Sequence, residues 1–175
     1  MAREARARQR RRLDSTLFRK AMGSFATGVT VVTVVDGDHV HGMTANAFMS
    51  GSLDPPLCLV SVAKRARTHA LIPAAGRFGV TVLSEHQERE ARRFSGQIGD
   101  QAVFPFEDLG GVRVLSEGVA RIAAILQAAH DCGDHTLYVG EVVEAALGHH
   151  RPLLYHNGAF KTFASRTMVP APEFW

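Results

Sequence analysis

Apolar and β-branched residues gather in short runs that are separated by turn residues over most of the chain. Such side chains favour extended backbone, and runs of this length bounded by Gly, Pro, Asn or Asp are typical of strands. Asp36-Gly37-Asp38 and Asn157-Gly158 have the composition of hairpin turns. The pattern predicts strands over 29–35, 39–44, 57–62, 78–83, 119–129 and 136–145, and a closing hairpin over 153–156 and 160–163.

Three other segments have a helical pattern. Residues 17–22 form a short amphipathic stretch that follows the cap-type residues Asp14, Ser15 and Thr16. A second helix is predicted over 68–75, although Pro73 weakens its end. Ser84 and Gln87 resemble a capping box, which predicts a third helix reaching about Phe94. Residues 95–117, interrupted by glycines and prolines, are predicted to form a long loop.

Strands outnumber helices in this pattern, and most connections are short. We therefore expect a mainly β fold with flanking helices, built as an antiparallel barrel rather than a doubly wound parallel sheet. A length of 175 residues fits one domain. The expected division is a basic N-terminal arm over 1–13, one domain over 14–165 and a C-terminal tail over 166–175.

The basic charge of the chain is unevenly distributed. Net charge is +3, but the first 12 residues hold six arginines and one glutamate, so the remainder is slightly acidic. A basic arm can bind nucleic acid. No groove-reading motif follows this arm, so a solvated extension is favoured and no nucleic-acid partner is expected.

Membrane and metal roles find little support in the sequence. No apolar run approaches the roughly 20 residues that a membrane helix needs, and no apolar stretch follows the arginines as in a secretory signal. A cytoplasmic protein without a membrane partner is therefore expected. His39 and His41 would share one face of a strand, but no third metal ligand is nearby. Cys58 and Cys132 form no Cys-x-x-Cys pair, so neither a disulfide nor a zinc site is expected.

Residues 42–50 are unusual because they combine small, hydroxyl and amide side chains with no charge. Such a stretch offers backbone N–H groups, a hydroxyl and a carboxamide to a flat polar ligand, and small side chains permit its close approach. Residues 65–68, Arg-Ala-Arg-Thr, open a predicted helix and suit a phosphate group. A planar ring plus a phosphate indicates a nucleotide cofactor. A strand-to-loop crossing followed by a capped helix explains the same residues, and the pattern alone does not choose. No Gly-rich dinucleotide fingerprint or P-loop is present.

Seven segments occur together in a characteristic order. They are 25–33, 42–48, 52–57, 78–83, 133–136, 139–142 and 152–155. In these segments the chain resembles the short flavin reductases of the FMN-binding split-barrel family, which serve as reductase components of two-component flavin-dependent monooxygenases. The resemblance implies a Greek-key split barrel and a homodimer with flavin near the interface.

The resemblance also implies a set of site residues. His135 is expected to orient the nicotinamide as the catalytic residue, with Tyr155 on the same side, and Arg67 to meet the phosphate, a role that Arg65 could also fill. The cofactor-binding residues expected are Thr44, Ala45, Asn46, Ala47, Ser50, Ser61, Val62, Ala63, Arg67, Thr68, Phe94, His135 and Tyr155.

The function implied is transfer of a hydride from NADH or NADPH to FAD or FMN, with reduced flavin passed to a partner monooxygenase. This chemistry is carried by the cofactors, which agrees with the lack of an obvious acid–base pair. The alternative is a flavin-binding electron carrier on the same barrel that does not oxidise nicotinamide. Neither the choice of flavin nor that of nicotinamide nucleotide follows from the sequence.

Overall fold

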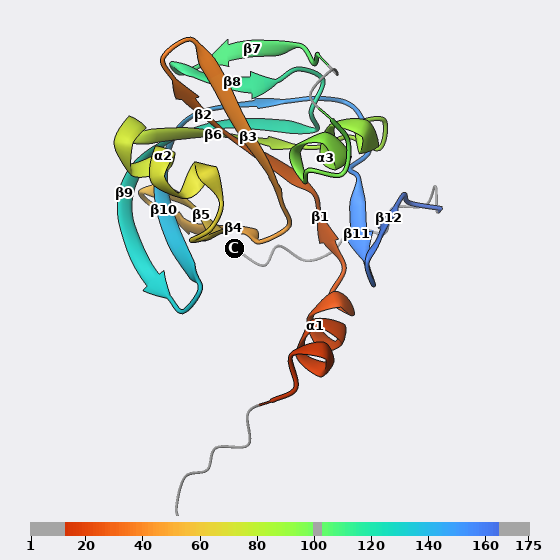
Figure 1. Ribbon diagram of the computed structural model, residues 1–175. Coiled ribbons are helices and arrows are strands. Elements are labelled where there is room, and N and C mark those ends of the chain that lie inside the picture. The colour runs from red at the N-terminus through yellow and green to blue at the C-terminus, as the bar shows by residue number, and fades with distance from the viewer. Residues whose placement is uncertain (1–12, 100–102, 165–175) are drawn as a thin grey trace, which may run out of the picture.

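The computed structural model describes residues 13–99 and 103–164, and within them the chain forms three helices and twelve strands (Figure 1). The helices are α1 (Ser15–Gly23), α2 (Arg67–Ala75) and α3 (Glu88–Phe94). The strands are β1 (Thr27–Gly28), β2 (Thr30–Asp36), β3 (His39–Ala45), β4 (Phe48–Leu53), β5 (Pro56–Ala63), β6 (Arg77–Val82), β7 (Phe106–Leu109), β8 (Val112–Leu115), β9 (Ala120–Cys132), β10 (His135–Leu147), β11 (Leu154–His156) and β12 (Ala159–Lys161).

Seven of the strands form one antiparallel sheet in the order β3-β2-β6-β9-β10-β5-β4. The sheet curls strongly, because β3 and β5 lie in contact although four strands separate them in this order. Strands β1, β11 and β12 form a small second sheet, and β7 pairs with β8. The predicted fold class, mainly β and antiparallel with flanking helices, is confirmed.

Strand β2 lies at the centre of the core and is covered on both faces. Val32 and Val34 pack into the cluster under α2, whereas Val31 packs into a second cluster beside α3. A strand that is buried on both sides has a continuous apolar sequence, which explains the run of valines. The neighbouring strand β3 crosses between α2 and α3 and contacts both helices, so it is held from two directions (Figure 1).

Helix α2 tolerates the proline that the sequence places in its interior. Pro73 has no N–H, so the carbonyl of His69, four residues earlier, loses its usual helical donor. The Tyr138 hydroxyl of β10 donates to that carbonyl at 2.8 Å instead. His69 in turn contacts the Thr136 hydroxyl at 2.9 Å through Nε2. The helix is therefore attached to β10 at this point, and it ends at Gly76, which adopts a positive φ of 66°.

Helix α1 projects from the rest of the domain (Figure 1). Of the three cap-type residues noted in the sequence, Asp14 caps the helix by accepting the Thr16 N–H at 3.0 Å, whereas Ser15 and Thr16 lie within it. The helix contains no buried residue, and Leu17, Phe18 and Met22 are all more than half exposed. Among the described residues, the apolar face of this amphipathic helix is therefore left mostly uncovered.

Two sequence predictions are wrong, and a third holds in part. Residues 95–117 are not one irregular loop, because β7 and β8 form a hairpin there; its turn is Gly110-Gly111, whose positive φ angles suit a tight two-residue connection. The segment after β3 contains an additional strand, β4, which pairs with β5. The predicted capping box is half formed: the Ser84 N–H donates to Gln87 Oε1 at 3.0 Å, whereas the Ser84 hydroxyl has no hydrogen-bond partner among the described residues and α3 begins only at Glu88.

The predicted arm and tail fall almost wholly on residues 1–12 and 165–175, which lie outside the described residues. In the remaining chain, no helix is long and apolar enough to cross a membrane.

Candidate active site

The segment from Thr44 to Ala47 connects the end of β3 to β4, and three neighbouring elements fix its backbone. The Thr30 hydroxyl of β2 donates to the Ala45 carbonyl at 2.7 Å. The Thr44 hydroxyl donates to the Ala91 carbonyl of α3 at 2.7 Å. The Ser61 N–H of β5 donates to the Ala47 carbonyl at 3.0 Å. Asn46 and Ala47 remain exposed, so the segment presents a fixed, uncharged surface.

A cavity of about 190 Å³, called here the Thr44 hollow, lies beside this segment. The cavity has a polar wall, which carries Ser95 and Gln97 from the turn after α3. Its aromatic wall consists of Tyr155 and Phe160, whose ring centroids are 5.6 Å apart. The residues lining the Thr44 hollow are Val29, Thr44, Ala45, Asn46, Ser95, Gln97, Tyr155 and Phe160.

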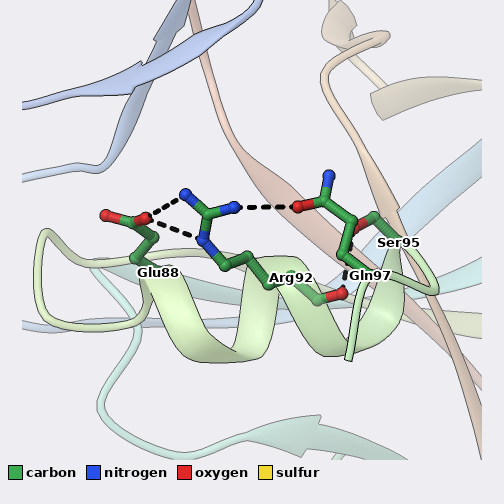
Figure 2. A network of polar contacts seen from close by, with 4 residues as sticks. All are labelled: Glu88, Arg92, Ser95 and Gln97. Carbon is green, nitrogen blue, oxygen red and sulfur yellow. Dashed lines mark hydrogen bonds and ion pairs between the residues drawn. The ribbon is translucent and has the colours of Figure 1, made fainter. Parts of the chain in front are cut away.

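The polar wall is held by a network centred on Arg92 (Figure 2). The Arg92 guanidinium donates to Glu88 Oε1 through Nε at 2.8 Å and Nη2 at 2.6 Å. Its third nitrogen, Nη1, donates to Gln97 Oε1 at 2.9 Å. The Ser95 hydroxyl donates to the Arg92 carbonyl at 3.0 Å. One side chain of α3 is thus joined to the turn that lines the hollow.

A second cavity of about 380 Å³, called here the Met49 hollow, is also lined by Asn46. Its walls are mostly apolar and come from α1, β1, β4, β5 and β10 and from the loops before β1 and β4. The residues lining it are Met22, Phe25, Thr27, Asn46, Ala47, Phe48, Met49, Leu59, Ser61 and Leu137. Asn46 borders both hollows and is therefore the junction between them.

His135 begins β10 and lies on the same sheet face as Ser61 and Ala63. Ser61 is paired with Leu137 and Ala63 with His135, and alternate residues of a strand share a face. Val62 points the opposite way into the core, so only its backbone is available to a ligand. The His135 side chain is 42% exposed, and its Nδ1 is 2.7 Å from Asp134 Oδ1. This hydrogen bond lowers the pKa of the Asp134 carboxyl below its usual value.

The predicted phosphate residues lie at the start of α2. The Thr68 hydroxyl is buried and donates to Met43 Sδ at 2.8 Å, so it is already engaged. Arg67 is exposed, and its charge helps burial to lower the pKa of His41. Arg65 is also exposed, and its charge contributes to the lowered pKa of Asp134 after the His135 contacts. Both arginines therefore remain available for an anionic group.

Seven of the thirteen predicted cofactor-binding residues line neither hollow: Ser50, Val62, Ala63, Arg67, Thr68, Phe94 and His135. Phe94 packs against Gly42 of β3 and against Phe104 and Phe106, with ring centroids 6.0 and 6.3 Å away. The Phe94 ring therefore packs against β3 and lines neither cavity. Ser50 is exposed on β4, where it pairs with Cys58.

The structure thus divides the predicted site into two groups that meet at Asn46. Thr44, Ala45 and Tyr155 lie at the Thr44 hollow, whereas Ala47 and Ser61 lie at the Met49 hollow. His135 and Ala63 continue the second group along the sheet but line neither cavity. Sequence reasoning missed Ser95, Gln97 and Phe160. The position of Ser95 directly after the predicted residue Phe94 is a signal that could have identified it. No local sequence pattern indicates that Gln97 lines a cavity.

A metal site finds no support in this geometry. Among residues 13–99 and 103–164, no group of three or more His, Cys, Asp or Glu side chains could hold a metal ion. The rings of His39 and His41 are neighbours on β3, with centroids 6.4 Å apart.

Comparisons with known proteins agree on one family. A family model described as a flavin reductase like domain matches residues 22–164. An NADH-dependent flavin reductase from Rhodococcus sp is 42% identical over 147 residues, covering 82% of this chain and 84% of the relative. The reductase component of 4-hydroxyphenylacetate 3-monooxygenase from Thermus thermophilus is 38% identical over 150 residues, covering 82% and 93%. The solved structure of the flavin reductase PheA2 superimposes with a TM-score of 0.86 at 41% identity, covering 87% of this chain and all of that one. The expected split-barrel fold is thereby confirmed, and the chain belongs to the flavin reductase-like family.

Proposed function

We propose that this protein is an NADH-dependent flavin reductase that transfers a hydride from the nicotinamide to FAD or FMN. Relatives named as reductases of FMN and of FAD, both with NADH, are 43% and 37% identical to the chain. The observation that carries the proposal is the junction at Asn46, where a fixed, uncharged segment lies between two hollows. Its backbone groups, carboxamide and aromatic neighbours fit a flat polar ring.

In this proposal the protein binds and orients. A bound flavin supplies the ring atom that accepts the hydride, so no protein acid–base pair is required. Asn46 and the backbone of 44–47 hold the flavin ring, and Arg67 or Arg65 with the N-terminus of α2 holds the phosphate. His135, whose imidazole is fixed by Asp134, orients the nicotinamide. The rate of hydride transfer then rises because the nicotinamide and the flavin ring are held in reacting geometry.

The test is the variant His135→Ala in a steady-state assay of NADH oxidation with added flavin. We expect the KM for NADH to rise and kcat to fall, because the nicotinamide loses its orienting contact. The matched control is His130→Ala, an exposed histidine on the neighbouring strand of the same hairpin. If kcat and KM of His135→Ala equal those of the wild type, the role proposed for His135 is wrong.

We further propose that the protein is a homodimer whose subunits meet at the Met49 hollow. Met22, Phe25 and Met49 are each more than half exposed there. Together with Leu59 and Leu137 they form an apolar surface of the kind that marks a protein interface. Analytical ultracentrifugation is expected to give twice the mass of the chain. A second copy placed there brings the interface to Asn46 and hence to the flavin.

The partner proposed is a flavin-dependent monooxygenase that receives reduced flavin by diffusion. Relatives named as reductase subunits of such monooxygenases are 34% and 38% identical to this chain. We propose that the exchange occurs in the cytoplasm, where reduced nicotinamide is available. The purified protein is then expected to lose flavin on dialysis, and a protein that keeps all its flavin contradicts this role.

An electron carrier on the same fold would leave NADH unconsumed when FAD or FMN is added.

A further inference from the structure

Arg92 fixes Gln97 at two points. Its Nη1 donates to the side-chain Oε1 at 2.9 Å, and its carbonyl accepts the backbone N–H of Gln97 at 2.9 Å. An exposed glutamine ordinarily samples several rotamers, and holding it costs side-chain entropy. The Arg92 guanidinium already has a carboxylate partner in Glu88. The contact therefore does more to order Gln97 than to satisfy Arg92.

The orientation of the Gln97 amide follows from this contact. Because Oε1 accepts from Arg92, the Nε2 group lies on the other branch of the amide with both N–H groups directed elsewhere. Figure 2 shows the Gln97 amide nitrogen turned away from Arg92. Gln97 itself lines the Thr44 hollow. A residue that lines the hollow thus carries a hydrogen-bond donor whose direction is set in advance by Arg92.

The same arginine also contacts the aromatic wall. Its guanidinium carbon is 5.2 Å from the centroid of the Phe160 ring, within the range of a cation–π contact. Phe160 packs edge-on against Tyr155, with ring centroids 5.6 Å apart. Both rings line the Thr44 hollow. Arg92 therefore connects the polar wall to the aromatic wall without lining the cavity itself.

We propose that Gln97 Nε2 donates a hydrogen bond to a planar heteroaromatic ring seated in the Thr44 hollow, and that Arg92 is the positioning residue that aims this donor. The inference rests on the proposed function, because the ring is supplied by a flavin or nicotinamide nucleotide. The required chemistry is a flat ring with an acceptor nitrogen or carbonyl at its edge. The isoalloxazine of the flavin and the adenine of FAD or NADH both have it.

The experiment measures dissociation constants, independently of turnover. Quenching of flavin fluorescence gives the Kd for FAD, FMN and riboflavin, and quenching of NADH fluorescence gives the Kd for NADH. The variants are Gln97→Met, which keeps the length of the side chain but removes the donor, Arg92→Met, and the double variant. Arg89→Met is the matched control, because Arg89 lies on the same helix but stacks over Phe104 instead.

We expect Gln97→Met to weaken binding about three- to tenfold, the range for one hydrogen bond to a neutral acceptor. Equal weakening of FAD, FMN and riboflavin assigns the isoalloxazine as the ring, whereas weakening of FAD without FMN assigns adenine, and weakening of NADH alone assigns a ring of the nicotinamide nucleotide. Arg92→Met is expected to weaken the same ligand by a similar factor. In the double variant the two losses should not add, because Arg92 acts through Gln97.

Some results would overturn the inference. If every ligand binds Gln97→Met within twofold of the wild type, Gln97 is not a ligand-binding residue. A lowered melting temperature with unchanged Kd values means that the network only stabilises α3 and its turn. Fully additive losses remove the positioning role of Arg92. Wild-type protein that binds flavin in the same titration keeps the proposed function in place when Gln97 fails, whereas wild-type protein that binds none removes both.

Discussion

The Thr44 hollow and the Met49 hollow share Asn46 but are built in different ways. Side chains on the walls of the first are fixed by hydrogen bonds, as at Thr44, Ser95 and Gln97. The walls of the second are Met, Phe and Leu side chains, and Phe25 and Met49 in it are 70% and 60% exposed. Fixed donors suit a small polar ring, because the cost of ordering them is met during folding. Adaptable apolar side chains suit a broad contact with another protein.

The largest effect is expected from a charge placed in the Met49 hollow. Met49→Asp should convert the dimer to a monomer, because the interface would bury a carboxylate with no partner, at a cost of several kcal/mol. Sedimentation velocity measures the change in mass. Val103→Asp is the control, because Val103 is 95% exposed and lines neither hollow. A Met49→Asp protein that remains dimeric would show that the subunits meet elsewhere.

Loss of the junction residue should have the next largest effect. Asn46→Ala removes the exposed carboxamide that borders both hollows, and we expect flavin to bind about tenfold more weakly, near the upper end for one hydrogen bond. Fluorescence quenching measures the dissociation constant. Gln127→Ala, which removes a surface carboxamide bonded to Glu141, should leave it unchanged. Equal affinities in all three proteins would place the flavin away from the junction.

A smaller effect is expected where Thr44 joins β3 to α3. Thr44→Val removes the hydroxyl that donates to the Ala91 carbonyl and should lower the free energy of unfolding by about 1 kcal/mol. The loss is limited because that carbonyl also accepts the Ser95 N–H. Urea denaturation measures the difference. Thr68→Val is the comparison, since its hydroxyl donates to a weakly accepting sulfur and should cost less. A larger loss at Thr68 than at Thr44 would contradict this ranking.

The smallest effect concerns His41, on the face of β3 that is turned toward α2. Burial, then the charge of Arg67, lowers its pKa below the ordinary 6.5, although Asp36 opposes this and His39 adds to it. The folded protein therefore favours the neutral imidazole, and stability is fully present above pH 6.5 and declines as the pH falls below that value. Urea midpoints at pH 7 and pH 5 should differ less in His41→Leu than in the wild type. His130→Leu, at an exposed position, should keep the wild-type difference.

Local patterns predicted the elements whose side-chain chemistry decides their structure. The run of β-branched residues in β2 is such a case, and so is Asn46, whose exposure follows from the polar exit of β3. The β7–β8 hairpin was missed because it depends on a distant strand. Val114 packs onto Gly79 of β6, where a Cβ would lie 2.8 Å from its methyl carbon.

Register, rather than residue type, decides which of the predicted residues of β5 present a side chain to the candidate site. Ser61 and Ala63 face the candidate site, whereas Val62 between them is fully buried in the core. In such a strand the sequence alone does not show which of the two alternating sets of side chains faces outward. The role of Gln97 is even less accessible, because it depends on one arginine of α3 reaching the turn that follows the helix.

The fit between Gly42 and Phe94 limits how this part of the protein can change. A Cβ on residue 42 would lie 2.6 Å from the Phe94 ring, so even alanine there forces the ring to move. The two positions are consequently not independent during evolution or engineering. A larger residue at 42 is expected to be accepted only together with a smaller one at 94, and libraries that vary either position alone will recover mostly the starting pair.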